Sequence, residues 1–177
     1  MNKKVILDTT CLIALEKLNL FNLLSQLYSK VLVPSQVVKE FSLTLPDFIQ
    51  IRKVKDIKLL KVLMLELGKG EAEVIALALE EGDCIIVLDD KKARKIAKDL
   101  NLKVTGTLGV LLKAKKLGLI EAIYPLLQEL KKKNFYIFEK FDDIIFDAPG
   151  LTKEERKEVY WAVAELVKNR LEKARSV

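Results

Sequence analysis

Carboxylates follow two apolar stretches of the sequence, each of which predicts a buried strand. Asp8 ends KKVILD at residues 3–8, and Asp89 and Asp90 end DCIIVLDD at residues 83–90. In an open parallel sheet, ligands bind at the carboxyl ends of the strands, where the strand order switches. If these two strands are neighbours, two or three carboxylates meet in one cleft. Such a group would suit a hard divalent cation and the hydrolysis of a phosphodiester bond.

Two glutamates add to this acidic group. Glu40 lies on the predicted helix after VLVP, and Glu71 opens the predicted helix after GKG. Every one of these acids also has a structural explanation, because Asp8, Asp89 or Asp90 would cap a following helix and Glu71 would be favoured by a helix dipole. Caps, however, require one acid per helix and do not require all of them at one end of a sheet.

The composition restricts the kind of metal that the chain can bind. It has no histidine, and its two cysteines, Cys11 and Cys84, sit in apolar surroundings without a CxxC spacing. An imidazole or thiolate site is therefore excluded, and any catalytic metal must be a hard cation such as Mg²⁺ or Mn²⁺. The formal charge of +6, with lysine-rich runs at 91–98, 113–116 and 129–134, suits a polyanionic partner, although solvated lysine faces are also common.

The hydropathy pattern predicts a cytoplasmic protein that does not enter the membrane. No run reaches the roughly 18 uncharged apolar residues that a membrane span requires. The N-terminal stretch MNKKVILDTTCLIAL resembles a signal peptide, but Asp8 and Glu16 interrupt its apolar region and no small-residue cleavage site follows.

Short apolar runs alternate with helical patterns, which is typical of an α/β domain with a mostly parallel sheet. Strands are expected at 3–8, 31–34, 51–55 at an edge, 83–89 and 103–106, with 135–141 as a further candidate. Helices are expected at 9–18, 19–28, 35–41, 56–68, 71–82, 91–101, 108–118 and 119–134, the last kinked or restarted at Pro125. Ser35 and Thr107 are predicted N-caps, and Gly118 is a predicted helix end.

The turn at 147–152 is the expected boundary between a domain at 1–147 and a C-terminal helical extension at 148–177. Thr152 and Glu155 form a T-x-x-E capping box that opens a helix at about 153–174. The apolar residues of this helix fall on one face, so it should pack either on its own core or on a second subunit.

Four segments resemble the PIN-domain family of metal-dependent ribonucleases, which includes the toxins of many prokaryotic toxin–antitoxin pairs. They are LDTTCLIAL with Asp8 and Thr10, VPSQVVKEF with Glu40, GEAEVIALAL with Glu71, and IIVLDDKKAR with Asp90. The resemblance covers roughly residues 3–140, and it implies a three-layer α/β/α domain with a mostly parallel central sheet. Residues GKGEAEVIALALEEG and LDDKKARKIAKDLNLKVTGTLGVLLKAKKLGLI are similar to those of a subgroup of prokaryotic PIN-like proteins.

The resemblance implies a site of Asp8, Glu40, Glu71 and Asp90 that binds Mg²⁺ or Mn²⁺ and catalyses cleavage of single-stranded RNA. Thr10 and Asp89 would assist these ligands, and Lys91, Lys92 and Arg94 would hold the RNA backbone. The sequence departs from the family pattern in two places. Glu71 stands where many members carry an aspartate, and the usual T-x-D at the later strand end is Leu88-Asp89-Asp90 here.

These departures keep a second interpretation open, in which the fold binds RNA or protein without catalysis. A phosphotransfer domain of the haloacid-dehalogenase or receiver kind fits less well, because Thr10 stands where the first requires an acid and the order of the acids is inverted for the second. If the protein is a toxin, a small antitoxin should cover the cleft. A homodimer is also expected, since PIN proteins commonly dimerise.

Overall fold

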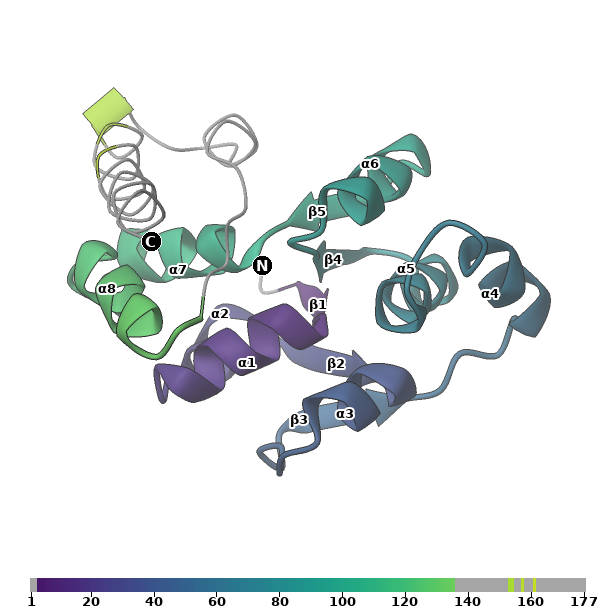
Figure 1. The fold of residues 1–177 in the computed structure, drawn as a ribbon, viewed down its shortest axis with the longest axis horizontal. Coiled ribbons are helices and arrows are strands. Elements are labelled where there is room, and N and C mark those ends of the chain that lie inside the picture. The colour runs from purple at the N-terminus through teal and green to yellow at the C-terminus, as the bar shows by residue number, and fades with distance from the viewer. Residues whose placement is uncertain (1–2, 136–152, 155–156, 158–160, 162–177) are drawn as a thin grey trace, which may run out of the picture.

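A computed structural model describes residues 3–135 together with 153, 154, 157 and 161. A parallel sheet lies at the centre of these residues (Figure 1). Within these residues the sheet has five strands in the order β3-β2-β1-β4-β5, all parallel. They are β1 (Lys4–Ile6), β2 (Lys30–Pro34), β3 (Ile49–Arg52), β4 (Cys84–Val87) and β5 (Lys103–Thr105). The expected α/β fold is confirmed, and β3 is an edge strand as predicted.

The central position of β1 determines where a ligand can bind. Ile6 pairs with Leu32 of β2 on one side and with Ile86 of β4 on the other, and all three side chains are fully buried. The chain runs from β1 toward β2 and later returns to β4, so the strand order switches between β1 and β4. The residues that follow these two strands therefore lie beside each other at the ligand-binding edge of the sheet.

Helices cover both faces of the sheet and give the expected three layers (Figure 1). Figure 1 shows α1 and α7 on one side of the strands and α4 and α5 on the other, while α3 packs against both α1 and α5. The helices are α1 (Thr9–Lys17), α2 (Asn22–Leu27), α3 (Ser35–Phe41), α4 (Ile57–Leu63), α5 (Lys69–Glu81), α6 (Lys91–Asp99), α7 (Thr107–Lys116) and α8 (Tyr124–Lys132). Pro125 lies in the first turn of α8, so the helix restarts there rather than bending.

Two predicted helix caps are wrong, because side chains from distant elements cap these helices instead. Ser35 is the first helical residue of α3, and the carboxylate of Glu73 on α5 accepts a hydrogen bond from the Gln36 N–H at 2.8 Å. Thr107 is likewise the first helical residue of α7, after Gly106. The prediction at Gly118 is confirmed, since this residue follows the end of α7 with φ of +71°.

Helix α5 carries two such carboxylates. Glu73 caps α3, and Glu80 accepts hydrogen bonds from the backbone N–H groups of Lys55 and Asp56, both at 2.8 Å. These bonds satisfy donors that would otherwise be unpaired at the start of α3 and just before α4. Helix α5 therefore fixes α3, the helix that carries Glu40, through a polar contact as well as through packing.

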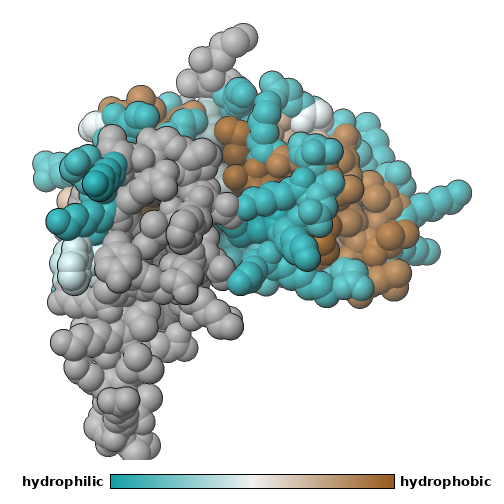
Figure 2. Space-filling view, turned by 90° about the horizontal axis from the view of Figure 1, so that it is seen from above, coloured by the Kyte–Doolittle hydropathy of each residue, from teal (hydrophilic) through white to brown (hydrophobic). Residues whose placement is uncertain are grey.

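The surface around α4 is unusually apolar. Ile57, Val62, Met64 and Leu65, in or directly after α4, and Leu79 on α5 are all exposed, Leu65 to 80%. Figure 2 shows hydrophobic surface on this side of the molecule, bordered by hydrophilic residues. A surface of this kind is typical of a contact site for another molecule.

Some predictions fall where the structure gives no description. The candidate strand at 135–141, the turn at 147–152 and most of the helix at 153–174 lie outside the described residues. Among the helices that are described, none is both long enough and apolar enough to cross a membrane.

Replacing Glu73 by alanine should lower the free energy of unfolding by about 1 kcal/mol, the usual cost of losing a helix cap. Urea denaturation would measure this. The variant Glu73→Gln keeps an acceptor oxygen and should lose less, and Glu121→Ala, at an exposed residue before α8, should change stability by under about 0.5 kcal/mol. Equal stabilities of Glu73→Ala and Glu121→Ala would show that the cap contributes nothing.

Candidate metal and nucleic-acid site

The carboxylates of Asp8 and Asp89 lie together at the strand-order switch. Asp8 follows β1 and is 6% exposed, and its Oδ2 accepts a hydrogen bond from the backbone N–H of Asp89 at 3.3 Å. Its Oδ1 accepts from the Cys11 N–H at 2.9 Å, so Asp8 is also the N-cap of α1. Capping and the acidic site thus involve the same side chain, and the two explanations given for Asp8 are compatible.

Asp89 is held from the other side by α7. The Thr107 N–H donates to Asp89 Oδ1 at 2.8 Å, and the Thr107 hydroxyl donates to Oδ2 at 2.5 Å. Gly106 leaves room for this approach, because a Cβ at that position would lie 2.7 Å from Asp89 Oδ1. The carboxylate of Asp89 therefore has a fixed position beside Asp8.

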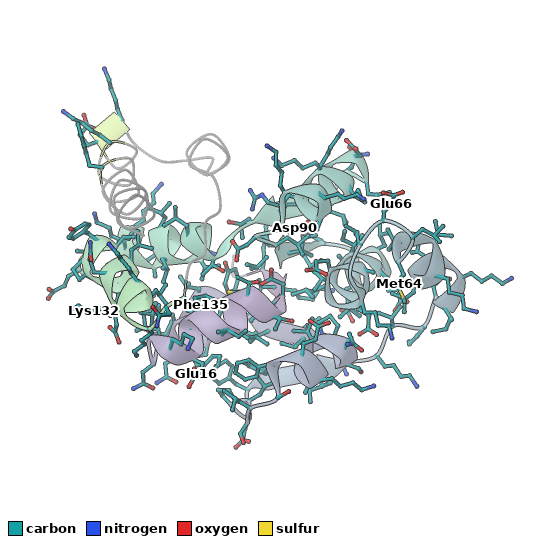
Figure 3. The ribbon with its side chains drawn as sticks, in the orientation of Figure 1. Glu16, Met64, Glu66, Asp90, Lys132 and Phe135 are labelled. Atoms are coloured by element: carbon teal, nitrogen blue, oxygen red, sulfur yellow. The ribbon has the colours of Figure 1, made fainter. Side chains whose placement is uncertain are left out.

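Asp90 does not face Asp8, contrary to the geometry expected from the sequence. Its side chain is exposed and accepts a hydrogen bond from the Ala93 N–H at 2.7 Å, which makes it the N-cap of α6. Figure 3 shows Asp90 at the start of α6. The physical reason is that β4 ends at Val87, and the three residues after it turn into α6 with Asp89 directed inward and Asp90 outward. Asp89, not Asp90, is the neighbour of Asp8.

Glu40 and Glu71 both place their carboxylates against the start of α5. The Thr9 hydroxyl donates to Glu40 Oε2 at 2.6 Å, which connects α3 to the residue after Asp8. Glu40 Oε2 lies 2.6 Å from where a Cβ on Gly70 would be, and Glu71 Oε2 lies 2.6 Å from where a Cβ on Gly68 would be. The two glycines of GKGE therefore make space for the two glutamates.

Burial and mutual repulsion make the charged forms of Asp8 and Asp89 unfavourable. Burial raises the pKa of Asp8 well above its usual value, the charge of Asp89 raises it further, and Glu71 adds to the same effect. Burial also raises the pKa of Asp89, although the bonds from Thr107 and the charge of Arg94 oppose the shift. A positive charge bound between these carboxylates would remove the repulsion.

The donor set fits a hard divalent cation, because carboxylate oxygens are the ligands that Mg²⁺ and Mn²⁺ prefer. Cys11 lies beside Asp8, but burial and then the charges of Asp8 and Asp89 raise the pKa of its thiol well above the usual value, so it stays protonated. As placed in the described part of the chain, no three acidic or cysteine side chains surround a common point. The Glu71 carboxylate is turned back over Gly68.

The three basic residues predicted to bind RNA differ in their surroundings. Lys91 is exposed at the start of α6, and Lys92 forms an exposed ion pair with Glu66 at 2.5 Å. Arg94 is half-buried and donates to the Leu88 carbonyl at 2.8 Å. Arg94 therefore has a structural role close to Asp89, while the lysines lie farther out on the surface.

Some residues of the site were missed by sequence reasoning. Thr10 was expected to assist the carboxylates, but Thr9 makes the contact with Glu40. Thr107 was predicted only as a cap, and GKG at 68–70 only as the segment that precedes the helix opened by Glu71. The spacing of GKGE was the one available signal, since two glycines so close to a glutamate at a helix start point to close packing there.

A family model described as a PIN domain matches residues 4–146 of the chain. No curated protein and no solved structure matches it significantly. The match covers every element from β1 to α8, including all four segments on which the resemblance rests.

Mn²⁺ should stabilise the protein through Asp89 and not through Asp90. At a Mn²⁺ concentration about 100 times the dissociation constant, the wild type should gain about 2.7 kcal/mol in free energy of unfolding. Asp89→Asn should lose this gain. Asp90→Asn should keep it, because asparagine is an equally good N-cap for α6.

Thermal melting with and without Mn²⁺ would measure these differences. The opposite result, in which Asp90→Asn loses the metal response and Asp89→Asn keeps it, would restore the ligand set predicted from the sequence.

Proposed function

Since the chain belongs to the PIN-domain family, we propose that it is a metal-dependent ribonuclease that hydrolyses phosphodiester bonds of single-stranded RNA. The observation that carries the proposal is the pair of carboxylates from Asp8 and Asp89 at the strand-order switch. A buried carboxylate beside a half-buried one is costly for a fold, and carboxylates perturbed in this way are typical of functional sites.

In this proposal Asp8 and Asp89 hold a Mg²⁺ or Mn²⁺ ion, with Glu71 and Glu40 as the additional carboxylates. Asp89 replaces Asp90 in the set of ligands predicted from the sequence. The bound ion would supply a nucleophilic water and stabilise the charge on the leaving oxygen. The chain's own contribution is to fix the carboxylates: Cys11 N–H orients Asp8, and the Thr9 hydroxyl orients Glu40.

RNA would approach along the start of α6. Lys91 is the first residue of α6, directly after the Asp90 cap, and Lys92 and Arg94 lie on the same helix. Contacts from such residues to phosphates would position a strand without selecting its sequence. An open, basic helix beside a carboxylate cluster is suited to a single-stranded substrate, whose backbone can bend toward the buried acids.

A protein-binding role is the second candidate, and the exposed apolar residues around α4 favour it. Lys58 and Lys61 lie on the same helix and are exposed, so the surface suits a partner with apolar and acidic side chains. We infer that such a partner would bury Val62 and Leu65; an antitoxin that covers the cleft stays a prediction from the sequence. The homodimer and the cytoplasmic location remain predictions from the sequence.

Replacing Asp8 or Asp89 by asparagine should abolish metal-dependent cleavage of a mixed pool of single-stranded RNA. Loss of metal binding removes several kcal/mol of transition-state stabilisation, which corresponds to more than roughly 100-fold in rate. Gel analysis of the RNA in Mn²⁺ and in chelator would measure this. Asp83→Asn is the matched control, because Asp83 lies at the opposite end of β4 in an exposed ion pair with Lys103.

A folded wild type that does not cleave the pool, and whose melting does not respond to Mn²⁺, would contradict the nuclease proposal. It would leave the protein-binding function as the better explanation.

Lys91→Gln should weaken binding of RNA and reduce its dependence on salt. Each phosphate contact to a single strand contributes about 0.7 to the slope of log affinity against log salt concentration, so the slope should fall by about this amount. Fluorescence anisotropy with the cleavage-deficient Asp8→Asn background would measure it. Lys116→Gln, at the far end of α7, removes the same charge and should leave the slope unchanged; equal slopes for both variants would place the RNA elsewhere.

A further inference from the structure

Both oxygens of Asp89 are bound by a single residue, Thr107. The Thr107 side chain is fully buried, and its N–H and hydroxyl reach Oδ1 and Oδ2 separately. The residue comes from α7, 18 positions away from Asp89 in the sequence. The carboxylate therefore cannot rotate without breaking one of these two bonds.

The helix cap alone explains only one of the two bonds. An N–H at the start of α7 needs an acceptor, and Asp89 Oδ1 supplies it. The hydroxyl bond satisfies no further backbone group, and any small side chain would permit the cap. What the hydroxyl does add is a fixed plane for the carboxylate.

The surrounding residues hold the same arrangement. The Asp89 backbone N–H donates to Asp8 Oδ2, so fixing Asp89 also fixes its distance from Asp8. Arg94 Nη1 lies 3.0 Å from where a Cβ on Gly106 would be and donates to the carbonyl of Leu88. The junction between β5 and α7 is thus fitted closely around the carboxylate.

We propose that Thr107 is a positioning residue of the site, whose hydroxyl orients the Asp89 carboxylate so that Asp8 and Asp89 bind one divalent cation together. This inference rests on the proposed function for the identity of the ion. Hydrogen-bond partners of metal ligands commonly change metal affinity by about 10- to 100-fold when removed. Thr107 would act in this way without touching the ion or the RNA.

Three variants would test the role of the hydroxyl. Thr107→Val keeps the shape and the backbone N–H but removes the hydroxyl, and Thr107→Ser restores it. Thr105→Val is the matched control, because Thr105 ends β5 in the same junction and its Oγ1 lies against Gly109, away from Asp89. Mn²⁺ affinity would be measured by electron paramagnetic resonance of the free ion, far below the melting temperature of each variant.

Thr107→Val should bind Mn²⁺ at least about 10-fold more weakly than the wild type, while Thr107→Ser and Thr105→Val should stay within a factor of about three. Stability does not decide the matter, because both valine variants alter the same junction. Wild-type affinity in Thr107→Val would overturn the proposal, and so would an equal loss in Thr105→Val or a failure of Thr107→Ser to restore binding.

The outcome for the wild type separates this inference from the proposed function. A wild type that binds Mn²⁺ but does not cleave RNA would contradict the nuclease proposal, and the affinities of the variants would still decide the role of Thr107. A wild type that binds no Mn²⁺ would overturn both.

Discussion

The site depends on one contact, the hydrogen bond from the Asp89 backbone to the Asp8 carboxylate. It forms only because β1 and β4 are hydrogen-bonded neighbours with Ile6 opposite Ile86, although their residues are far apart in the sequence. The two strands are short, and Leu7 and Leu88, the residues directly before the two aspartates, are fully buried, as is Ile6. The core therefore supplies the rigidity with which two acidic groups are held together.

Such an arrangement opposes the stability of the fold. A buried carboxylate is costly even when it is hydrogen-bonded, and the second carboxylate makes the first less favourable. Two backbone N–H groups stabilise the charged form of Asp8, and Thr107 and Arg94 stabilise that of Asp89. These interactions offset the cost of burial only in part, because the pKa of each carboxyl is still raised. A cation bound between them would complete the compensation, so under the proposed function the stability of the fold and its ion binding follow from the same electrostatic balance.

The sequence was sufficient for the sheet and insufficient for the details of the site. Runs such as KKVILD and DCIIVLD predict strands because they are apolar and bounded by polar residues, and their order predicts a parallel sheet. Sequence patterns could not decide which of Asp89 and Asp90 faces Asp8. The side chains of a strand point alternately to its two faces, but both aspartates come after the end of β4. The Thr107–Asp89 and Glu73–Gln36 bonds join residues 18 and 37 positions apart, and no local pattern indicates such pairs.

The glycines of GKGE lower the stability of helix α5 locally and also leave space for the glutamates of the site. Glycine is a poor helix former, yet Gly70 lies inside α5, where alanine would favour the helix. A Cβ there would meet the Glu40 carboxylate, which the Thr9 hydroxyl holds in place. The helix thus has a less favourable residue at the position where the Glu40 carboxylate lies against its first turn. The carboxylates of Asp8 and Asp89 and the glycine in α5 each lower the stability of the fold at one end of the sheet, as expected where a site is selected for more than stability.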